Sequence, residues 1–301
     1  MDRHIGYMYR ITFHEKEIGM DEHIIEAAGK TRVVVRDGIV VSAEEPKISE
    51  CPLALRFACP VYEMTSDAVS RNIQDRINSF GMCTKTRNLY SSDDFVGFGA
   101  SELISSGLAA RFIDAAVIVC DGAGTVVITD PKMVQGIGGR MSGLVSTSPI
   151  PEVIQKIIQG RGFVPDQKNA SLDPVSGVIA AKEAGYKSLV VTISDPADAK
   201  RVRSVEPGAI IIAVHTTGYS IPDAQEAGEN VDIITACASR AVWEVCGAKA
   251  CLQAGSTVPV FALTKPGKQL ILLRLADIDH PIHLYHSSLP VHGKKEPSPL
   301  I

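Results

Sequence analysis

Residues suited to chemistry follow two apolar stretches in the second half of the sequence. His215 comes directly after the apolar run 209–214, and Cys237 follows the run 231–235. If both runs are parallel strands, their carboxyl ends meet at one edge of the sheet, where ligands bind in open α/β folds. At that edge we expect His215 to act as a catalytic acid or base and Cys237 as a nucleophile or ligand. A buried structural histidine is the alternative for His215.

Hydroxyl groups accompany these two residues. Thr216 and Thr217 follow the histidine, and Ser239 lies two positions after the cysteine. All three are candidates to bind the ligand. Serine is also a residue type that caps helices by accepting a hydrogen bond from a backbone N–H group, so capping is the alternative role of Ser239.

A glycine-rich stretch in the first half has an unusual spacing. Residues 135–143 read Gln-Gly-Ile-Gly-Gly-Arg-Met-Ser-Gly. The backbone N–H groups of Gly136, Gly138 and Gly139 would converge on an anion, and the guanidinium of Arg140 would pair with it. The stretch therefore predicts an anion-binding loop, with a flexible connection as the alternative.

Thiols are a third source of chemistry. Four of the seven cysteines lie in the first half, at positions 51, 59, 83 and 120. Cys51, Cys83 and Cys120 are candidate metal ligands, and four thiolates would satisfy an iron–sulfur cluster. No C-x-x-C pair occurs and the spacings match no standard ferredoxin pattern, so buried apolar thiols are the alternative. The sequence leaves the identity of any cofactor open.

The elements that must position these residues differ between the two halves of the chain. After Pro151, apolar runs alternate with helical stretches near residues 196–205, 221–228, 239–248 and 266–275. The runs themselves are residues 188–193, 209–214, 231–235 and 258–263. Strands separated by single helices predict βαβ units and a parallel, Rossmann-like sheet.

The first half has the pattern of an α+β region. It predicts a short helix capped by Asp21, a hairpin about Asp37-Gly38, helices near residues 66–79 and 100–110, and a hairpin about residues 121–124. Together the halves predict an α/β protein.

Four segments follow from these patterns. We expect an extension at 1–19, an N-terminal α+β region at 20–160, a C-terminal parallel α/β region at 173–275 and a tail at 276–301. The polar, Gly- and Pro-containing stretch between residues 160 and 172 gives the boundary. One domain of two layers would satisfy the same pattern.

Composition excludes several classes of function. The net charge is -4, so no electrostatic case exists for binding nucleic acid, which needs a basic face. The apolar runs have the length of strands and are too short to cross a membrane. Residues 1–19 lack the apolar core of a signal peptide, so we expect a cytoplasmic protein.

Several strings of residues carry a resemblance to a known family. They are residues 20–35, 80–83, 118–127, 134–140, 213–218 and 235–239. On these strings, from Met20 to about residue 275, the sequence resembles the methanogenesis marker protein 8 family of archaea. The extension and the tail with its four histidines lie outside the resemblance.

The resemblance implies an accessory role in archaeal methane metabolism. With the residues above, it predicts binding of a small anionic ligand or cofactor, with methyl-coenzyme M reductase or its maturation factors as partners. One alternative is an enzyme of unknown reaction that uses the Cys/His site. Another is a non-catalytic adaptor between proteins.

Overall fold

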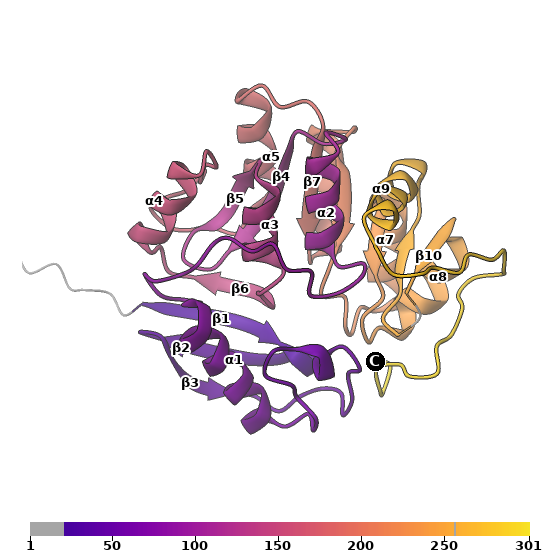
Figure 1. Ribbon diagram of the computed structural model, residues 1–301, viewed down its shortest axis with the longest axis horizontal. Coiled ribbons are helices and arrows are strands. Elements are labelled where there is room, and N and C mark those ends of the chain that lie inside the picture. Colours follow the sequence, from indigo (N-terminus) through magenta and orange to yellow (C-terminus); the bar gives the residue numbers. More distant parts are fainter. Residues whose placement is uncertain (1–20, 256) are drawn as a thin grey trace, which may run out of the picture.

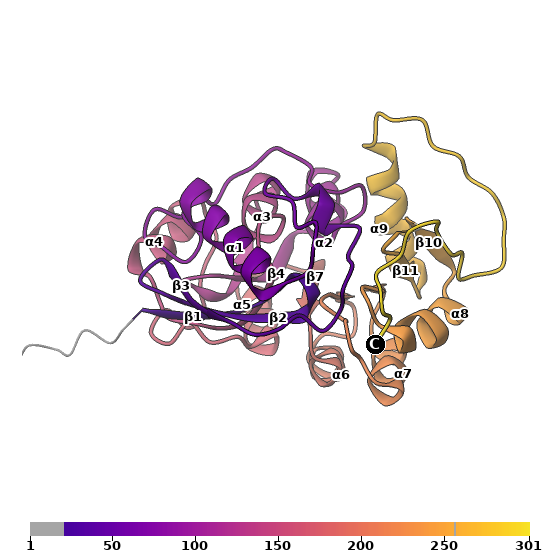
Figure 2. The same ribbon diagram turned by 90° about the horizontal axis from the view of Figure 1, so that it is seen from below.

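The computed structural model describes residues 21–255 and 257–301, which form two sheets (Figure 1). The smaller sheet is antiparallel, with the strand order β3-β2-β1-β6. Its strands are β1 (Glu22–Ala27), β2 (Thr31–Arg36), β3 (Ile39–Ala43) and β6 (Gly143–Thr147). In Figure 2 this sheet and its helix lie nearest the viewer.

The larger sheet has the order β10-β11-β9-β8-β7-β4-β5. Its strands are β4 (Ala115–Cys120), β5 (Gly124–Ile128), β7 (Leu189–Ile193), β8 (Ile210–Ala213), β9 (Ile233–Thr235), β10 (Leu252–Ala254) and β11 (Val260–Ala262). β4, β7, β8 and β9 run parallel, so their carboxyl ends share one edge. The other strands pair antiparallel.

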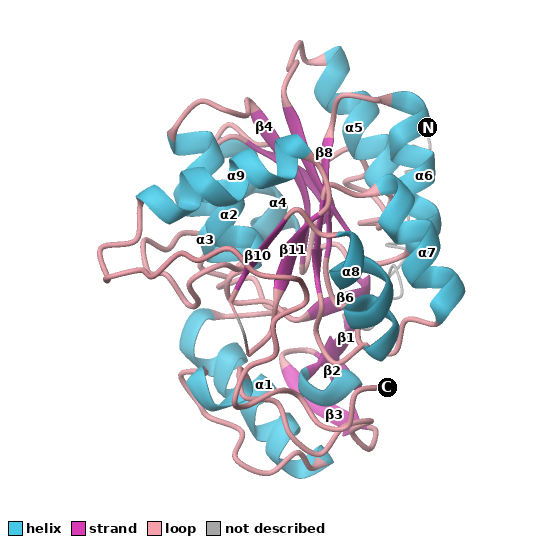
Figure 3. Cartoon of the chain, turned by 90° about the vertical axis from the view of Figure 1, so that its right-hand side faces the viewer, coloured by secondary structure: helices cyan, strands magenta, loops and turns pink. Residues whose placement is uncertain are grey.

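Helices cover both faces of the larger sheet (Figure 3). One face packs on α2 (Ala100–Ala109), α3 (Pro131–Gly138), α4 (Pro151–Gln159) and α9 (Lys265–Ala276). The other face packs on α5 (Pro174–Glu183), α6 (Pro196–Val205), α7 (Ile221–Asn230) and the π-helical segment η3 (Val242–Cys246), which continues into α8 (Gly247–Lys249). Because both faces are covered, the parallel strands consist mainly of apolar residues.

Helix α1 (Ser66–Phe80) covers the smaller sheet, and its sequence sets both of its ends. The Thr65 side chain accepts a hydrogen bond from the Ala68 N–H group at the first turn. Gly81 ends the helix in the left-handed conformation, at φ 73°. The apolar side chains between them face the sheet, where Val69 and Ile73 are fully buried. Short 3-10 turns at Ala28–Lys30 and Ala54–Arg56 complete the described elements of this part.

The α/β class, both hairpins and the helices near 66–79 and 100–110 are confirmed. Two predicted elements are wrong. The segment after Asp21 is strand β1, because its burial alternates with a period of two, which is the pattern of a strand packed on one face. The predicted parallel strand at residues 258–263 is β11, which runs antiparallel to β9, because the chain reaches it through the β10–β11 hairpin rather than through a helix.

The division between the sheets does not follow the predicted boundary at 160–172. The β4–β5 hairpin pairs with β7 in the larger sheet, and β6 returns to the smaller sheet to pair with β1. The predicted extension at 1–19 lies outside the described residues. In the part of the chain that the structure describes, no helix is long and apolar enough to cross a membrane.

Candidate functional site

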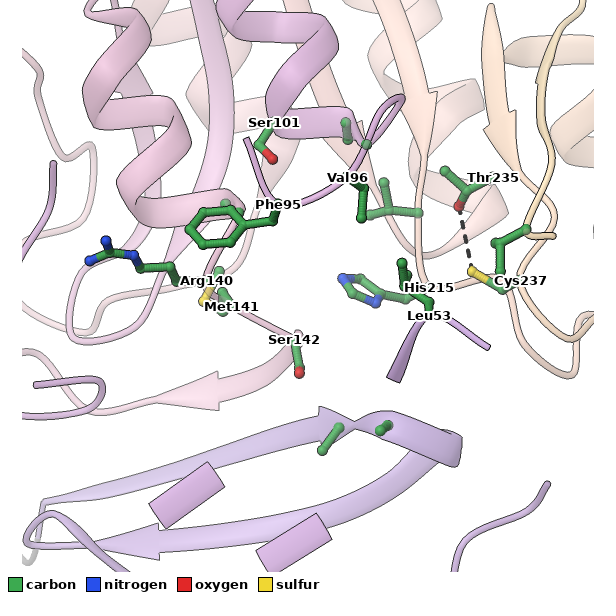
Figure 4. A pocket seen from close by; sticks show the side chains of 18 of the residues that line it. Leu53, Phe95, Val96, Ser101, Arg140, Met141, Ser142, His215, Thr235 and Cys237 are labelled. Atoms are coloured by element: carbon green, nitrogen blue, oxygen red, sulfur yellow. Dashed lines mark hydrogen bonds between the residues drawn. The ribbon is translucent and has the colours of Figure 1, made fainter. Parts of the chain in front are cut away.

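A cavity of about 1370 Å³ lies between the two sheets. The carboxyl ends of β7, β8 and β9 form one wall, with Ser194, His215 and Cys237 among the lining residues. Residues of helix α1 and of the segment 48–59 also line the cavity, and Figure 4 shows Leu53 of that segment near His215. His215 and Cys237 therefore open onto one cavity, as their positions after parallel strands predict.

His215 presents its ring to the cavity from a constrained backbone. Its φ angle is 57°, in the left-handed region that few residues other than glycine adopt. The ring packs against β6, since a Cβ atom added at Gly143 would lie 3.3 Å from the His215 Cγ atom. Burial lowers the pKa of His215 to about 4, so the ring is neutral near pH 7. No hydrogen bond joins it to another described residue, which leaves its nitrogens available to a ligand.

The loop that carries His215 is fixed from both sides. The Lys30 Nζ atom on the smaller sheet donates a hydrogen bond to the Thr217 carbonyl at 2.6 Å. The Thr216 hydroxyl donates to the Thr235 carbonyl at 2.6 Å, which ties the loop to β9. The left-handed histidine is thus held in place by its neighbours, as strained residues at functional sites usually are.

Cys237 has the same unusual backbone as His215, with φ at 44°. Its Sγ atom lies 3.6 Å from the Thr235 hydroxyl. The His215 ring points away from this thiol (Figure 4), and no hydrogen bond joins the two side chains. The structure therefore places both residues in one cavity without forming a Cys–His nucleophile pair, and their catalytic roles stay predictions.

The three predicted hydroxyl ligands have different positions. Thr217 lines the cavity. Thr216 is buried, and its hydroxyl donates a hydrogen bond to the Thr235 carbonyl of β9. The Ser239 hydroxyl is also buried, donating to the Tyr219 carbonyl and accepting from the Val242 N–H group. Ser239 thus caps a helix, and only Thr217 of the three faces the cavity.

The glycine-rich stretch, predicted to be a loop, is the end of helix α3. Gly136 and Gly138 lie within α3, and the Gly139 N–H group donates to the Gln135 carbonyl at 3.1 Å. Gly136 does not line the cavity but allows close packing, since a Cβ atom there would lie 2.2 Å from the Leu89 carbonyl oxygen. The end of a helix presents carbonyl oxygens rather than N–H groups, which disfavours an anion.

A buried arginine satisfies those carbonyls. The Arg87 guanidinium donates to the carbonyls of Gly136 and Ile137, at 3.2 and 3.4 Å. Its Nε atom lies 3.0 Å from an Asp121 carboxylate oxygen, and both side chains are fully buried. Although burial opposes the charge, the Asp121 carboxylate raises the pKa of Arg87. This ion pair holds the end of α3 rigid.

Arg140 lines the cavity, but its guanidinium points away from His215 and Cys237 (Figure 4). Its guanidinium lies over the rings of Phe80 and Phe95, 5.1 and 5.7 Å from their centroids. It donates to the Ser91 hydroxyl at 3.3 Å. Burial, with a smaller effect from Arg87, lowers its pKa. Gly138 and Gly139 line the cavity beside it.

Arg76 is the cation that the sequence interpretation missed. It reaches the cavity from α1 and donates from Nη1 to the Ser142 hydroxyl at 3.0 Å. Among the described residues, Nε and Nη2 have no hydrogen-bond acceptor and no carboxylate lies within 4.0 Å. Burial lowers its pKa to about 10, which still leaves it charged near pH 7. Asn72 and Arg76 are four residues apart, so they lie on one side of the helix, beside the apolar side of Ile73 and Ile77. This spacing of polar residues is the sequence pattern from which Arg76 could have been predicted.

The predicted metal ligands do not come together. Cys51 lines the cavity, whereas Cys83 and Cys120 are buried in the interior and do not line it. Within residues 21–255 and 257–301, no three His, Cys, Asp or Glu side chains are arranged to hold a metal ion. Burial raises the pKa of all three thiols, well above the ordinary value for Cys83. Cys59, the fourth thiol of this half, also lines the cavity.

Two comparisons place the chain among known proteins. Residues 23–276 match the family described as "Uncharacterized protein conserved in archaea (DUF2099)". The chain belongs to this family. It is also 43% identical over 285 residues to Uncharacterized protein MJ0054 of Methanocaldococcus jannaschii, covering 94% of this chain and 100% of that protein.

The DUF2099 match runs from the second residue of β1 to the last residue of α9. Arg76, His215 and Cys237 therefore lie in the part that defines the family. The segment after residue 276, which also reaches the cavity through Lys295 and Pro297, lies beyond it.

Proposed function

We propose that this DUF2099 protein binds an organic anion of coenzyme size in the cavity between its sheets. Its volume of about 1370 Å³ exceeds the range of roughly 300–1000 Å³ that is typical for drug-sized ligands. The lining is more apolar than polar, and it includes charged side chains of both signs, among them Arg76, Arg140 and Asp75. This combination is characteristic of sites for extended organic molecules.

The observation that carries the proposal is the position of Arg76. The Arg76 guanidinium lies 4.7 Å from the Phe57 ring centroid, and no described carboxylate lies within 4.0 Å of it. Its Nε and Nη2 donors are suited to a carboxylate or phosphate. It replaces Arg140 as the expected anion contact, because the Arg140 guanidinium is directed toward Ser91.

The strand ends that line the cavity support a second candidate, an enzyme. His215 is neutral and without a described partner, and Cys237 shares its strained backbone conformation at the end of the next strand. A ligand that reaches from Arg76 to this edge would bring its reactive atom between an imidazole and a thiol. The reaction in this proposal would be proton transfer by His215 or attack by Cys237.

For the biological setting we propose an accessory role in archaeal methane metabolism, including maturation of methyl-coenzyme M reductase. The resemblance to methanogenesis marker protein 8 supports this setting. The cavity supports only the binding of a small molecule.

A ligand search with paired variants tests the proposal. The protein is purified without oxygen, incubated with a small-molecule extract of a methane-producing archaeon, and examined by native mass spectrometry. We expect one retained organic anion. Arg76→Met should weaken its binding roughly 10- to 150-fold, the loss of one charge-assisted contact worth about 1.5–3 kcal/mol.

Arg71→Met is the matched control, because Arg71 lies on the same helix but is exposed and paired with Asp67. It should bind the ligand as the wild type does. Equal binding by all three proteins would refute the role of Arg76. A protein that retains no small molecule but captures a protein partner would favour the adaptor alternative, and bound iron would favour a cluster carrier.

A further inference from the structure

The segment 289–301, here called the strap, is bound to the smaller-sheet side of the cavity. The Ser298 carbonyl accepts hydrogen bonds from the N–H groups of Ser49 and Glu50, at 2.8 and 2.9 Å. The Ser298 N–H group donates in return to the Glu50 carbonyl at 2.9 Å. The sequence predicts a tail without regular structure at residues 276–301, and this part of it has no helix or strand but is bound by hydrogen bonds to both sides of the cavity.

The same strap is bound to the larger-sheet side. The Ile301 N–H group donates to the Ala238 carbonyl at 2.9 Å, and the Arg240 N–H group donates to the Ile301 carbonyl at 3.1 Å. The Gln253 side chain exchanges two hydrogen bonds with the backbone of Val291, each at 2.8 Å.

The two attachments flank the thiols of the cavity. Glu50 precedes Cys51, and Ala238 follows Cys237, so the four strap residues 298–301 join the neighbours of two lining cysteines. Lys295, within the strap, is itself part of the cavity wall. Figure 1 shows the end labelled C between the smaller sheet and the part that holds β10 and α8.

We propose that the strap is part of the binding site and gates its thiol end, a regulation of the site that rests on the proposed function. The strap has no helix or strand and is attached by a short series of hydrogen bonds. Such a segment opens locally without unfolding the sheets on either side. Its release would part the segment 48–59 from the loop 237–240 and admit the ligand beside Cys237.

A disulfide that locks the strap tests the gate. Glu50 and Ser298 are a hydrogen-bonded antiparallel pair, for which the Cα separation is about 5.5 Å, within the range that a disulfide spans. The variant combines Glu50→Cys and Ser298→Cys with Cys51→Ser, which prevents pairing with the neighbouring thiol. The rate of Cys237 alkylation by N-ethylmaleimide is then followed by peptide mass spectrometry.

We expect oxidation of this variant to slow the alkylation of Cys237 at least ten-fold relative to its reduced form. Cys251 is exposed and does not line the cavity, so its rate should not change and serves as the internal control. A second variant, Gln253→Leu, removes the side-chain hydrogen bonds to Val291 and should speed the alkylation of Cys237 several-fold.

Equal Cys237 rates in the locked and reduced forms, or an unchanged rate in Gln253→Leu, would overturn the gate. The probe is a thiol reagent, so the outcome does not depend on the cavity having a ligand. If locking slows alkylation and the ligand search finds nothing, the gate stands and the proposed function fails. If a ligand binds and the rates are equal, only the gate fails.

Discussion

Replacing His215 with glutamine should remove a pH-dependent loss of stability from this protein. The folded-state pKa of about 4 lies below the ordinary value of about 6.5 for histidine. As the pH falls through 6.5, the unfolded chain takes up a proton at this position and the folded chain does not. Stability from the neutral ring is therefore complete above about pH 6.5 and is lost as the pH falls toward 4.

The size of the effect follows from that difference. Each pH unit between the two pKa values costs about 1.4 kcal/mol of unfolding free energy, so the full loss is about 3 kcal/mol. Near pH 7.5 the wild type and His215→Gln differ only by packing. Near pH 4.5 the wild type should have lost about 2–3 kcal/mol that the variant keeps.

Urea denaturation of both proteins at several pH values measures this difference. Other titrating groups contribute equally to both curves and cancel. His286→Gln makes the same change at an exposed residue of the tail and should follow the wild type. A constant difference between wild type and His215→Gln from pH 7.5 to 4.5 would mean that the ring is solvated in the cavity, and the lowered pKa of His215 would be refuted.

Two further predictions concern packing at the end of α3. Gly136→Ala should destabilise the protein by about 1–3 kcal/mol, because the new Cβ atom meets the Leu89 backbone, whereas Gly138→Ala, whose nearest neighbour is the Ser101 Cβ atom at 3.3 Å, should cost less. Thermal midpoints of the pair measure this, and equal midpoints would contradict the packing role. Arg87→Met should cost about 3–5 kcal/mol in urea denaturation by leaving the Asp121 carboxylate buried without its partner. A loss below about 1 kcal/mol, as expected for an exposed arginine, would contradict the buried ion pair.

Local signals in the sequence were sufficient for much of the fold. The ends of α1 depend on Thr65 and Gly81, which act within one turn of the helix, so adjacent residues predict them. The Asp37-Gly38 hairpin is specified in the same way, by two residues with positive φ angles. The convergence of His215 and Cys237 followed from the rule that parallel strands end at one edge.

Errors arose where a distant partner decides the outcome. His23 is a polar residue on the buried side of β1, where its Nδ1 atom meets the Thr147 hydroxyl 124 positions along the chain. Because a polar residue occupies this buried position, the sequence does not show the alternation of apolar and polar residues that predicts a strand. Gly136 resembles a loop residue until the Leu89 backbone is packed against it, and Arg76 becomes part of the site only when β6 brings Ser142 beside it.

The return of β6 to the smaller sheet also affects how the chain folds. Strand β1 cannot pair with β6 until residue 147 has been synthesised. During translation, one edge of β1 therefore has unpaired backbone N–H and C=O groups. Pairings across such long separations form slowly, because closing the intervening chain costs entropy before any contact is gained. The bond from Ser49 to Ser298 spans 249 positions, so the cavity acquires its last wall only after both sheets are complete.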